Sequence, residues 1–121
     1  RDRRHASRNM PAIANGAVTF DTVAREWRCK YTGPAPESAS LEAVEKLFEK
    51  HLPAMKALDA EVFRQVCGGC LDFKVSTVLP LERFGEWEKK EFTPEKDFLA
   101  ELQKIDGVSA VETQTITFMK M

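Results

Sequence analysis

The stretch EVFRQVCGGCLDFKVSTVL at residues 61–79 contains two runs rich in valine and phenylalanine, separated by a Gly-Gly pair. Such runs favour β-strands, and two glycines between them indicate a tight hairpin, because both can adopt positive φ in the turn. Pairing across a two-residue turn would place Cys67 directly opposite Cys70. Side-chain alternation then predicts one shared apolar face that belongs to the core, made of Val62, Val66, Leu71, Phe73 and Val75.

The sequence before this hairpin predicts another strand. Residues 18–32 alternate along the chain, so that Trp27, Cys29 and Tyr31 fall on the face turned toward the core. The Gly-Pro-Ala-Pro sequence that follows should end the strand, because proline cannot donate a hydrogen bond to a neighbouring strand.

Two amphipathic helices are predicted, one on each side of the hairpin. Apolar side chains recur every three or four positions over residues 41–55 and again over residues 98–105. Pro53 should bend or end the first helix, because a proline inside a helix removes one backbone hydrogen bond. The predicted N-caps are Ser38 or Ser40 for the first helix and Thr93, followed by Pro94, for the second.

The predicted elements follow the order strand, helix, strand, strand, helix, strand, with the last strand over residues 108–119. Two βαβ halves joined by a hairpin predict an α+β, ferredoxin-like split βαβ sandwich (βαββαβ), with an antiparallel sheet and two helices on one face. We expect a single domain over residues 18–121. A basic, disordered tail over residues 1–17 should precede it, because this segment has little apolar surface to bury.

Composition and charge exclude several classes of protein. The chain has 121 residues, 43% of them hydrophobic, and a formal net charge of −1. The length and hydrophobic fraction are enough for one core. The near-neutral net charge argues against nucleic-acid binding, apart from the basic N-terminal arm. No apolar run is long enough for a membrane span. The lack of a secretory signal predicts an intracellular protein, and the arginine-rich, acid-poor N-terminus also suits organellar import.

Three cysteines suggest redox or metal chemistry. Cys67 and Cys70 form a CxxC motif and are the candidate redox pair, although a strand rather than a helix N-terminus follows them. The plain alternative is a hairpin tip without a redox role. A tetrahedral metal site would also need Cys29 and His51, the remaining candidates in the folded part. Cys29 falls on the opposite face from the hairpin thiols, so we predict no metal and no cofactor.

Large aromatic side chains are the candidate binding residues. Phe84, Trp87 and Phe92 lie within a highly charged connection after the hairpin, where irregular helical turns are expected. One core can absorb one or two of these rings at a sheet end, so a third is expected to reach outward to a partner. Trp27 and Tyr31 complete the candidate binding residues, with core packing as their plain alternative.

No acid, base and nucleophile converge in the sequence, so we predict no catalytic residues. The favoured function is a non-catalytic protein-binding or assembly module, either a subunit of a larger complex or a homodimer. It would bind a protein partner or its own copy through the helix-free sheet face, which presents Ala24, Glu26, Lys30, Gln65, Asp72, Ser76, Ile116 and Phe118. Two alternatives remain: a small dimeric α+β-barrel-type ligand-binding protein or enzyme, and a thiol redox or sensor protein that uses the CGGC hairpin.

Overall fold

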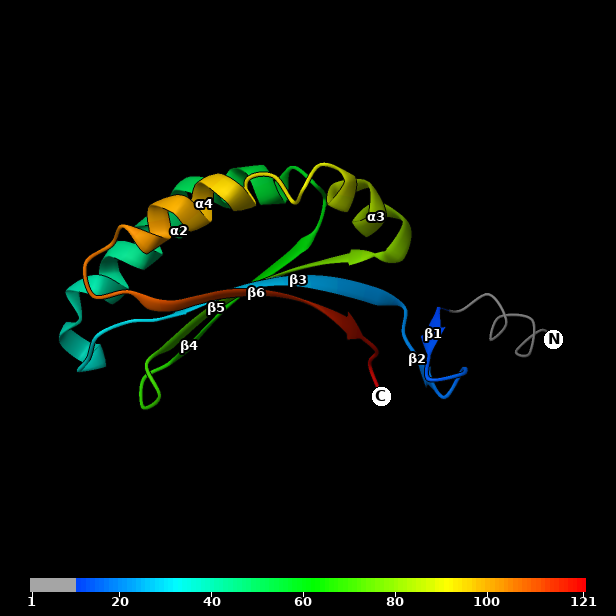
Figure 1. Ribbon diagram of the computed structural model, residues 1–121, viewed down its shortest axis with the longest axis horizontal. Helices are drawn as coiled ribbons and strands as arrows, with labels where there is room; N and C mark the ends of the chain where they lie inside the picture. Colours follow the sequence, from blue (N-terminus) through cyan, green and yellow to red (C-terminus); the bar gives the residue numbers. More distant parts are fainter. Residues whose placement is uncertain (1–10) are drawn as a thin grey trace.

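The computed structural model describes residues 11–121 as an α+β protein with two antiparallel sheets and three α-helices (Figure 1). The four-stranded sheet contains β3 (Thr22–Lys30), β4 (Glu61–Cys67), β5 (Asp72–Pro80) and β6 (Ser109–Phe118). The two-stranded sheet contains β1 (Ala12–Ile13) and β2 (Val18–Thr19). The helices are α2 (Ala39–Lys56), α3 (Leu81–Lys89) and α4 (Glu95–Gln103), and a short 3-10 helix, η1, covers Ala35–Glu37. No helix within residues 11–121 is long and apolar enough to cross a membrane.

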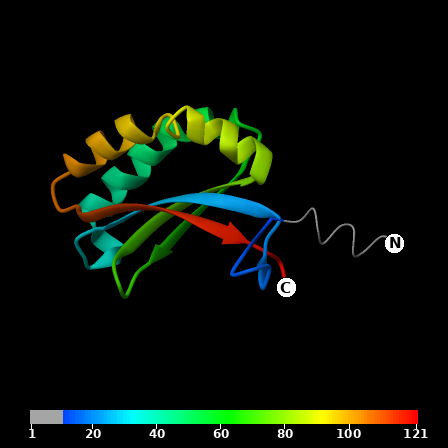
Figure 2. The same ribbon diagram turned by 45° about the vertical axis from the view of Figure 1, so that its right-hand side comes forward.

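The strands of the large sheet follow the order β4-β5-β3-β6, and every neighbouring pair is antiparallel. The strands β3 and β4 therefore run in the same direction with β5 between them, and β5 and β6 do so with β3 between them. All three helices lie on one face of this sheet, as two views show (Figures 1 and 2). The opposite face carries no helix from the described residues, and we call it the open face.

The core lies between the large sheet and the helices. Trp27 of β3 is 1% exposed, and its ring stacks on Phe98 of α4 with the ring centroids 4.9 Å apart. Cys29 and Tyr31 are also buried, as the alternation of the sequence predicted. Burial of one large apolar side chain contributes about 1.5–3 kcal/mol, so this alternating face holds β3 against the helices.

The β4–β5 hairpin forms, but its turn is longer than predicted. Cys67 pairs with Asp72 rather than with Cys70, so residues 68–71 form a four-residue turn. The predicted register is therefore wrong by two residues. The side chains within β4 and β5 nevertheless stay on their predicted faces, because the side-chain period of a strand is two.

Contacts of Leu71 account for the longer turn. Leu71, and neither glycine of the turn, adopts the left-handed conformation, with a φ of 60°. Its side chain packs against the core, and its carbonyl accepts a hydrogen bond from the Tyr31 N–H at 3.0 Å. A Cβ added at Gly33 would lie only 2.9 Å from the Leu71 side chain, so the two chain segments are in close contact. These tertiary contacts outweigh the local preference of Gly-Gly for a two-residue turn.

Pro53 does not end the first helix, which was one of the two outcomes predicted for it. The helix α2 continues to Lys56, and the Ser38 Oγ caps its N-terminus by accepting from the Leu41 N–H at 3.0 Å. Pro53 lies in the last turn of α2, where little helix remains to be disrupted. The Ala57 N–H donates to the Pro53 carbonyl at 3.0 Å and closes this last turn.

The segment after β5 is more regular than predicted. Its first part is the helix α3, where we expected irregular turns. The second helix then begins one residue later than predicted, with Pro94 at the N-cap position. Thr93 is not the cap, because its Oγ1 donates to the Lys90 carbonyl at 2.6 Å instead.

Residues 12–19 form a short hairpin, in which β1 pairs with β2. The strand predicted over residues 18–32 is interrupted at Phe20 and Asp21, whose N–H groups donate to the carbonyls of Pro11 and Phe118. The backbone thus changes partner there, from the small sheet to the large one. The rest of the expected tail, residues 1–10 with its basic arm, lies outside the described residues.

Candidate functional site

The open face of the large sheet has no cover from the described helices (Figures 1 and 2). The register places on this face every side chain that the sequence analysis assigned to it. Phe63 of β4 and Val78 of β5 also lie there, although the sequence analysis did not name them. Phe63 was predictable, because strict alternation along the strand places it on the same face as Gln65.

Five apolar side chains cross the open face diagonally and form what we call the apolar band: Phe63, Val78, Ala24, Ile116 and Phe118. Ala24 pairs with Val78 on one side and with Ile116 on the other. Phe63 lies diagonal to Val78, and Phe118 follows Ile116 on the same face of β6. Phe63 is 49% exposed and Phe118 is 38% exposed. Ala24 and Val78, in the middle of the band, are already buried, at 0% and 6% exposure. Covering the exposed ends of the band should therefore supply the gain in free energy, at about 25 cal/mol per Å² of apolar surface.

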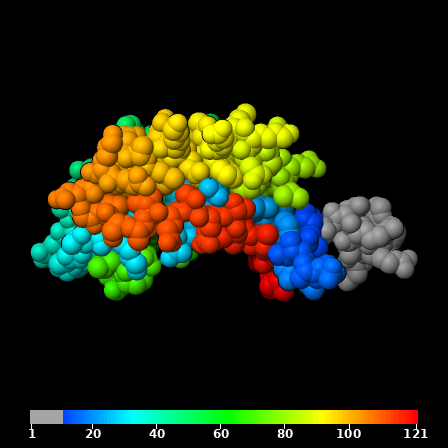
Figure 3. All heavy atoms as spheres, in the orientation of Figure 1, coloured from blue at the N-terminus to red at the C-terminus, as the bar shows by residue number. Residues whose placement is uncertain are grey.

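The open face is also hollowed. In the space-filling view, the underside of the molecule is concave between the β4–β5 turn, in green, and the β1–β2 hairpin, in blue (Figure 3). The hairpin carries two further exposed apolar side chains, Ile13 and Val18. A partner seated in this hollow could thus cover apolar side chains from both sheets.

Charged side chains of the open face pair with one another toward the β4–β5 turn. The Lys30 Nζ lies 2.8 Å from the Asp72 Oδ1, and hydrogen bonding by Lys30 lowers the pKa of Asp72. Arg28 lies 3.6 Å from Glu26 and 3.8 Å from Glu112. These pairs leave little unbalanced charge at this end of the face, so they provide no strong attraction for a polyanion.

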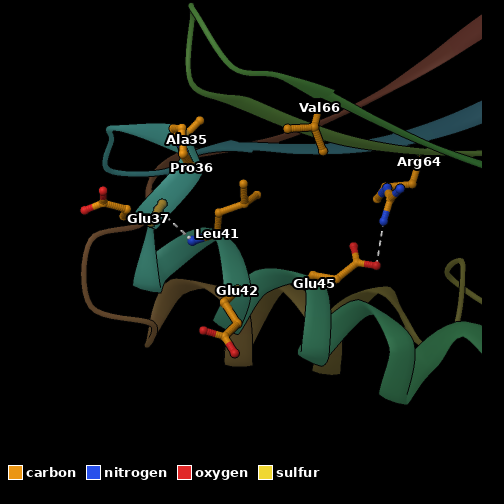
Figure 4. A pocket seen from close by; sticks show the side chains of 9 residues that line it. Ala35, Pro36, Glu37, Leu41, Glu42, Glu45, Arg64 and Val66 are labelled. Atoms are coloured by element: carbon orange, nitrogen blue, oxygen red, sulfur yellow. Dashed lines mark hydrogen bonds and ion pairs between the residues drawn. The ribbon is translucent and has the colours of Figure 1, made fainter.

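A groove of about 510 Å³ separates α2 from the edge strand β4 (Figure 4). Its lining consists of Ala35, Pro36, Glu37, Ser38, Leu41, Glu42, Glu45, Arg64 and Val66. Val66 of β4 and Leu41 of α2 point toward the space between strand and helix (Figure 4). At one end, the Arg64 guanidinium lies 2.6 Å from the Glu45 Oε2. No local sequence pattern reveals this groove, because it depends on the spacing between a helix and a strand.

Cys67 and Cys70, the candidate redox pair, form a disulfide within the β4–β5 turn, with their Cα atoms 5.5 Å apart. The backbone on both sides is anchored. The Tyr31 hydroxyl donates to the Cys67 carbonyl and the Lys30 Nζ donates to the Cys70 carbonyl, both at 2.8 Å. The turn is thus held in place by contacts that do not involve either sulfur.

Cys29 and His51, the remaining metal-ligand candidates, each have one carboxylate nearby rather than a set of ligands. Burial, and to a smaller extent the charge of Asp72, raises the pKa of the Cys29 thiol to about 11. The His51 Nε2 lies 3.0 Å from the Glu101 Oε2, and its ring packs edge-on against Phe98. Within residues 11–121, no three ligand-type side chains are grouped so that they could hold a metal ion.

The five aromatic binding candidates are all buried. Phe84, Trp87 and Phe92 pack together, with the Trp87 ring centroid 6.2 Å from Phe84 and 5.0 Å from Phe92. The prediction that one of these rings reaches outward is wrong, because the regular helix α3 and the turn after it direct all three into the core. Trp27 and Tyr31 are buried as well. In this structure, none of the five rings is exposed enough to contact a partner.

No protein-family model matches the chain, and no curated protein or solved structure is significantly similar to it. The open face, the groove beside β4 and the disulfide turn are therefore the features from which function has to be inferred.

Proposed function

We propose that this protein is a non-catalytic assembly module that forms a homodimer through the open faces of two large sheets. The two apolar bands pack against each other around a two-fold axis, and the helices lie on the outside. An interface of this symmetry uses the same patch on both copies, so the patch must be compatible with itself.

The exposed ends of the apolar band, Phe63 and Phe118, are the observation that carries this proposal. Phe63 and Phe118 lie on the two edge strands of the sheet, at opposite ends of the band. Rotation about a two-fold axis through the middle of the band can therefore place Phe63 and Phe118 of one copy over the apolar band of the partner. Each phenylalanine would then be buried against apolar side chains of the partner, and a few such anchoring side chains usually contribute most of the binding energy of an interface.

The charge of the open face favours a second copy as the partner. Its strands carry three basic and four acidic side chains there: Arg28, Lys30, Lys74, Glu26, Glu61, Asp72 and Glu112. Two such faces meet without strong like-charge repulsion, which would prevent self-association of a highly charged face. A highly acidic or basic partner has little to complement on this face.

We also assign the large sheet with α2 and α4 to the ferredoxin-like split βαβ sandwich. Two observations support this assignment: α2 links β3 to β4, and α4 lies between β5 and β6 in the chain. Each linked pair runs in the same direction with one antiparallel strand between its members. The β1–β2 hairpin and α3 are additions to this arrangement.

Sedimentation of the whole chain over a range of concentrations tests the dimer. The wild type should sediment as a dimer, and Phe63→Glu should weaken dimerisation by about 30-fold or more, the effect of losing one interface hot spot. Val66→Glu is the matched control, because Val66 lies on the same strand with similar exposure but on the opposite face. A monomeric wild type, or equal effects of the two substitutions, would contradict the proposal.

The disulfide in the exposed β4–β5 turn favours a second candidate function, that of a thiol redox or sensor protein. In the redox step, an external dithiol reduces the Cys67–Cys70 bond: both cysteines become thiols, and the dithiol becomes a disulfide. Equilibration in dithiothreitol buffers, followed by alkylation and mass measurement, gives the reduction potential. A value below about −300 mV is typical of structural disulfides and would exclude this candidate.

A further inference from the structure

We infer that the groove between α2 and the outer edge of β4 binds an extended peptide, which pairs with β4 as an additional strand and places a basic side chain against Glu45. This site lies on the other side of β4 from the apolar band. It is therefore independent of the proposed homodimer.

The outer edge of β4 is available for pairing. Within residues 11–121, β4 pairs with β5 alone, so the N–H and C=O groups along its other edge have no strand partner. Its register with β5 continues from Glu61 to Cys67 without a shift, and the strand contains no proline. Proteins usually protect an edge strand with a proline or a bulge. The other edge strand, β6, has such an irregularity opposite Arg28 and Lys30.

The groove beside this edge can receive the side chains of an added strand. Alternate side chains of a bound peptide point to the same face, so every second one would enter the space between β4 and α2. Val66 is 44% exposed there, and Leu41 faces it from α2 (Figure 4). These two side chains form a subsite for an apolar residue of the peptide.

The charge of the groove selects a basic peptide. Glu37, Glu42 and Glu45 line it, and Arg64 is the single cation among the described lining residues. The Glu45 Oε2 accepts from Arg64, but its Oε1 is buried and has no hydrogen-bond partner among the described residues. The Glu45 side chain as a whole is 28% exposed, so a lysine or arginine of the peptide can approach this carboxylate and form a charge-assisted hydrogen bond.

A second copy of β4 is a poorer occupant of the same edge. Antiparallel pairing of two β4 strands about their central residue places Arg64 opposite Arg64 of the other copy. Like charges directly opposite each other destabilise a strand pair. Each arginine would also be drawn away from Glu45, its partner within the chain.

Selection of a random heptapeptide phage library against the full chain tests this inference. Enriched peptides should contain a lysine or arginine flanked by alternating apolar residues. A labelled peptide synthesised from the enriched set should bind the chain in a titration, and binding should slow hydrogen exchange of the β4 amides. This exchange measurement uses the wild type, so it remains informative if a variant fails to fold.

Three substitutions complete the experiment. Glu45→Gln should weaken binding of the labelled peptide about tenfold, because one charge-assisted hydrogen bond is lost. Val66→Glu should abolish binding, whereas Phe63→Glu should leave it unchanged even if the dimer is lost. Failure to enrich a peptide, unchanged exchange in β4, or loss of binding in Phe63→Glu but not in Val66→Glu would overturn the inference. A dimer that is lost in Val66→Glu alone would show that β4 pairs with its own copy, which also overturns it.

Discussion

Phe63 and Val66 lie three residues apart on β4 and expose similar fractions of their side chains, 49% and 44%, on opposite faces of the sheet. Phe63 belongs to the apolar band of the open face, and Val66 lines the groove beside α2. One edge strand thus contributes to both proposed interfaces. Assembly and peptide binding can occur together, because covering one face of the strand leaves the other face free.

Trp87 should contribute to folding rather than to binding. Its ring is 2% exposed and packs against Trp27, Phe84 and Phe92, and its Nε1 donates to the Thr93 carbonyl at 2.8 Å. Trp87→Ala should therefore lower the free energy of unfolding by about 3–5 kcal/mol, because it leaves a large cavity. Chemical denaturation measures this loss. Trp87→Phe keeps an aromatic ring and should lose less, and a loss below about 1 kcal/mol for the alanine variant would contradict the packing described here.

The aromatic residues around Trp87 also mark a limit of prediction from sequence. Seven charged side chains between residues 81 and 92 correctly indicated a segment near the surface, but they did not indicate how many rings the core could hold. That number depends on α3 covering the end of the sheet. The side-chain capacity of a core is a property of several elements together, so no local pattern in the segment reveals it.

The main strands and helices, by contrast, followed from local patterns. Alternation in β3 and the three-to-four spacing in α2 each report which face of one element is buried, and burial of that face decides the structure. The register of the hairpin differed from prediction, and Pro53 lies inside α2 rather than at its end. The register depends on contacts beyond the local sequence, such as the packing of Leu71 beside Gly33, whereas Pro53 is tolerated because it lies in the last turn of the helix. The open face followed from alternation, whereas the groove beside β4 could not be derived without the distance between strand and helix.

The carboxylate of Glu95 should be important for attaching α4 to the sheet. Its Oε1 accepts from the Arg25 Nε and the Trp27 Nε1, both at 2.7 Å, and the Glu95 and Arg25 side chains are largely buried. Glu95→Ala leaves both donors without this acceptor, so the free energy of unfolding should fall by about 2–4 kcal/mol. Asp97→Ala, in the same helical turn but exposed, should cost less than about 1 kcal/mol.

A double-mutant cycle separates the Glu95–Arg25 interaction from other effects of these substitutions. Denaturation of Glu95→Ala, Arg25→Ala and the double variant should give a coupling energy of at least about 1 kcal/mol, because the two side chains share two hydrogen bonds. Strictly additive losses would mean that the pair does not hold α4 to β3.

Glu101 should make stability depend on pH in the acid range. Hydrogen bonds from Lys50, at 2.8 Å, and from His51, at 3.0 Å, lower the pKa of the Glu101 carboxyl in the folded state. The resulting stabilisation is complete above the unfolded-state pKa of about 4.3 and is lost as pH falls through the lower folded-state value.

Urea denaturation of the wild type and Glu101→Gln, between about pH 6 and pH 2, measures this contribution. The wild type should be the more stable protein at the upper end of this range, and the difference should disappear at the lower end. Glu42→Gln serves as a control, because the exposed pair of Glu42 with Lys46 joins neighbouring turns of one helix rather than two helices. A difference that grows on acidification would have the wrong sign for a lowered carboxyl pKa.

The three cysteines should differ sharply in reactivity toward a disulfide reagent such as DTNB. The native chain should show no rapid reaction, because Cys67 and Cys70 are bonded to each other and Cys29 is buried. After mild reduction, two thiols should react rapidly, whereas Cys29 should react only when the protein unfolds. With the pKa of Cys29 raised to about 11, on the order of one thiol in a thousand is ionised at pH 8, and the thiolate is the reactive form.

Two variants assign these reactions. Cys29→Ser should remove the reaction that requires unfolding and leave the two rapid thiols of the reduced protein unchanged. Replacing Cys67 and Cys70 together by serine should do the reverse, and it should cost little stability because the turn keeps its hydrogen bonds from Tyr31 and Lys30. Raising the pH toward 11 in the folded protein should increase the ionised fraction of Cys29, so a reaction that stays slow there would show that steric burial limits its rate. Three equally fast thiols in the reduced, folded chain would contradict the buried position of Cys29 on β3.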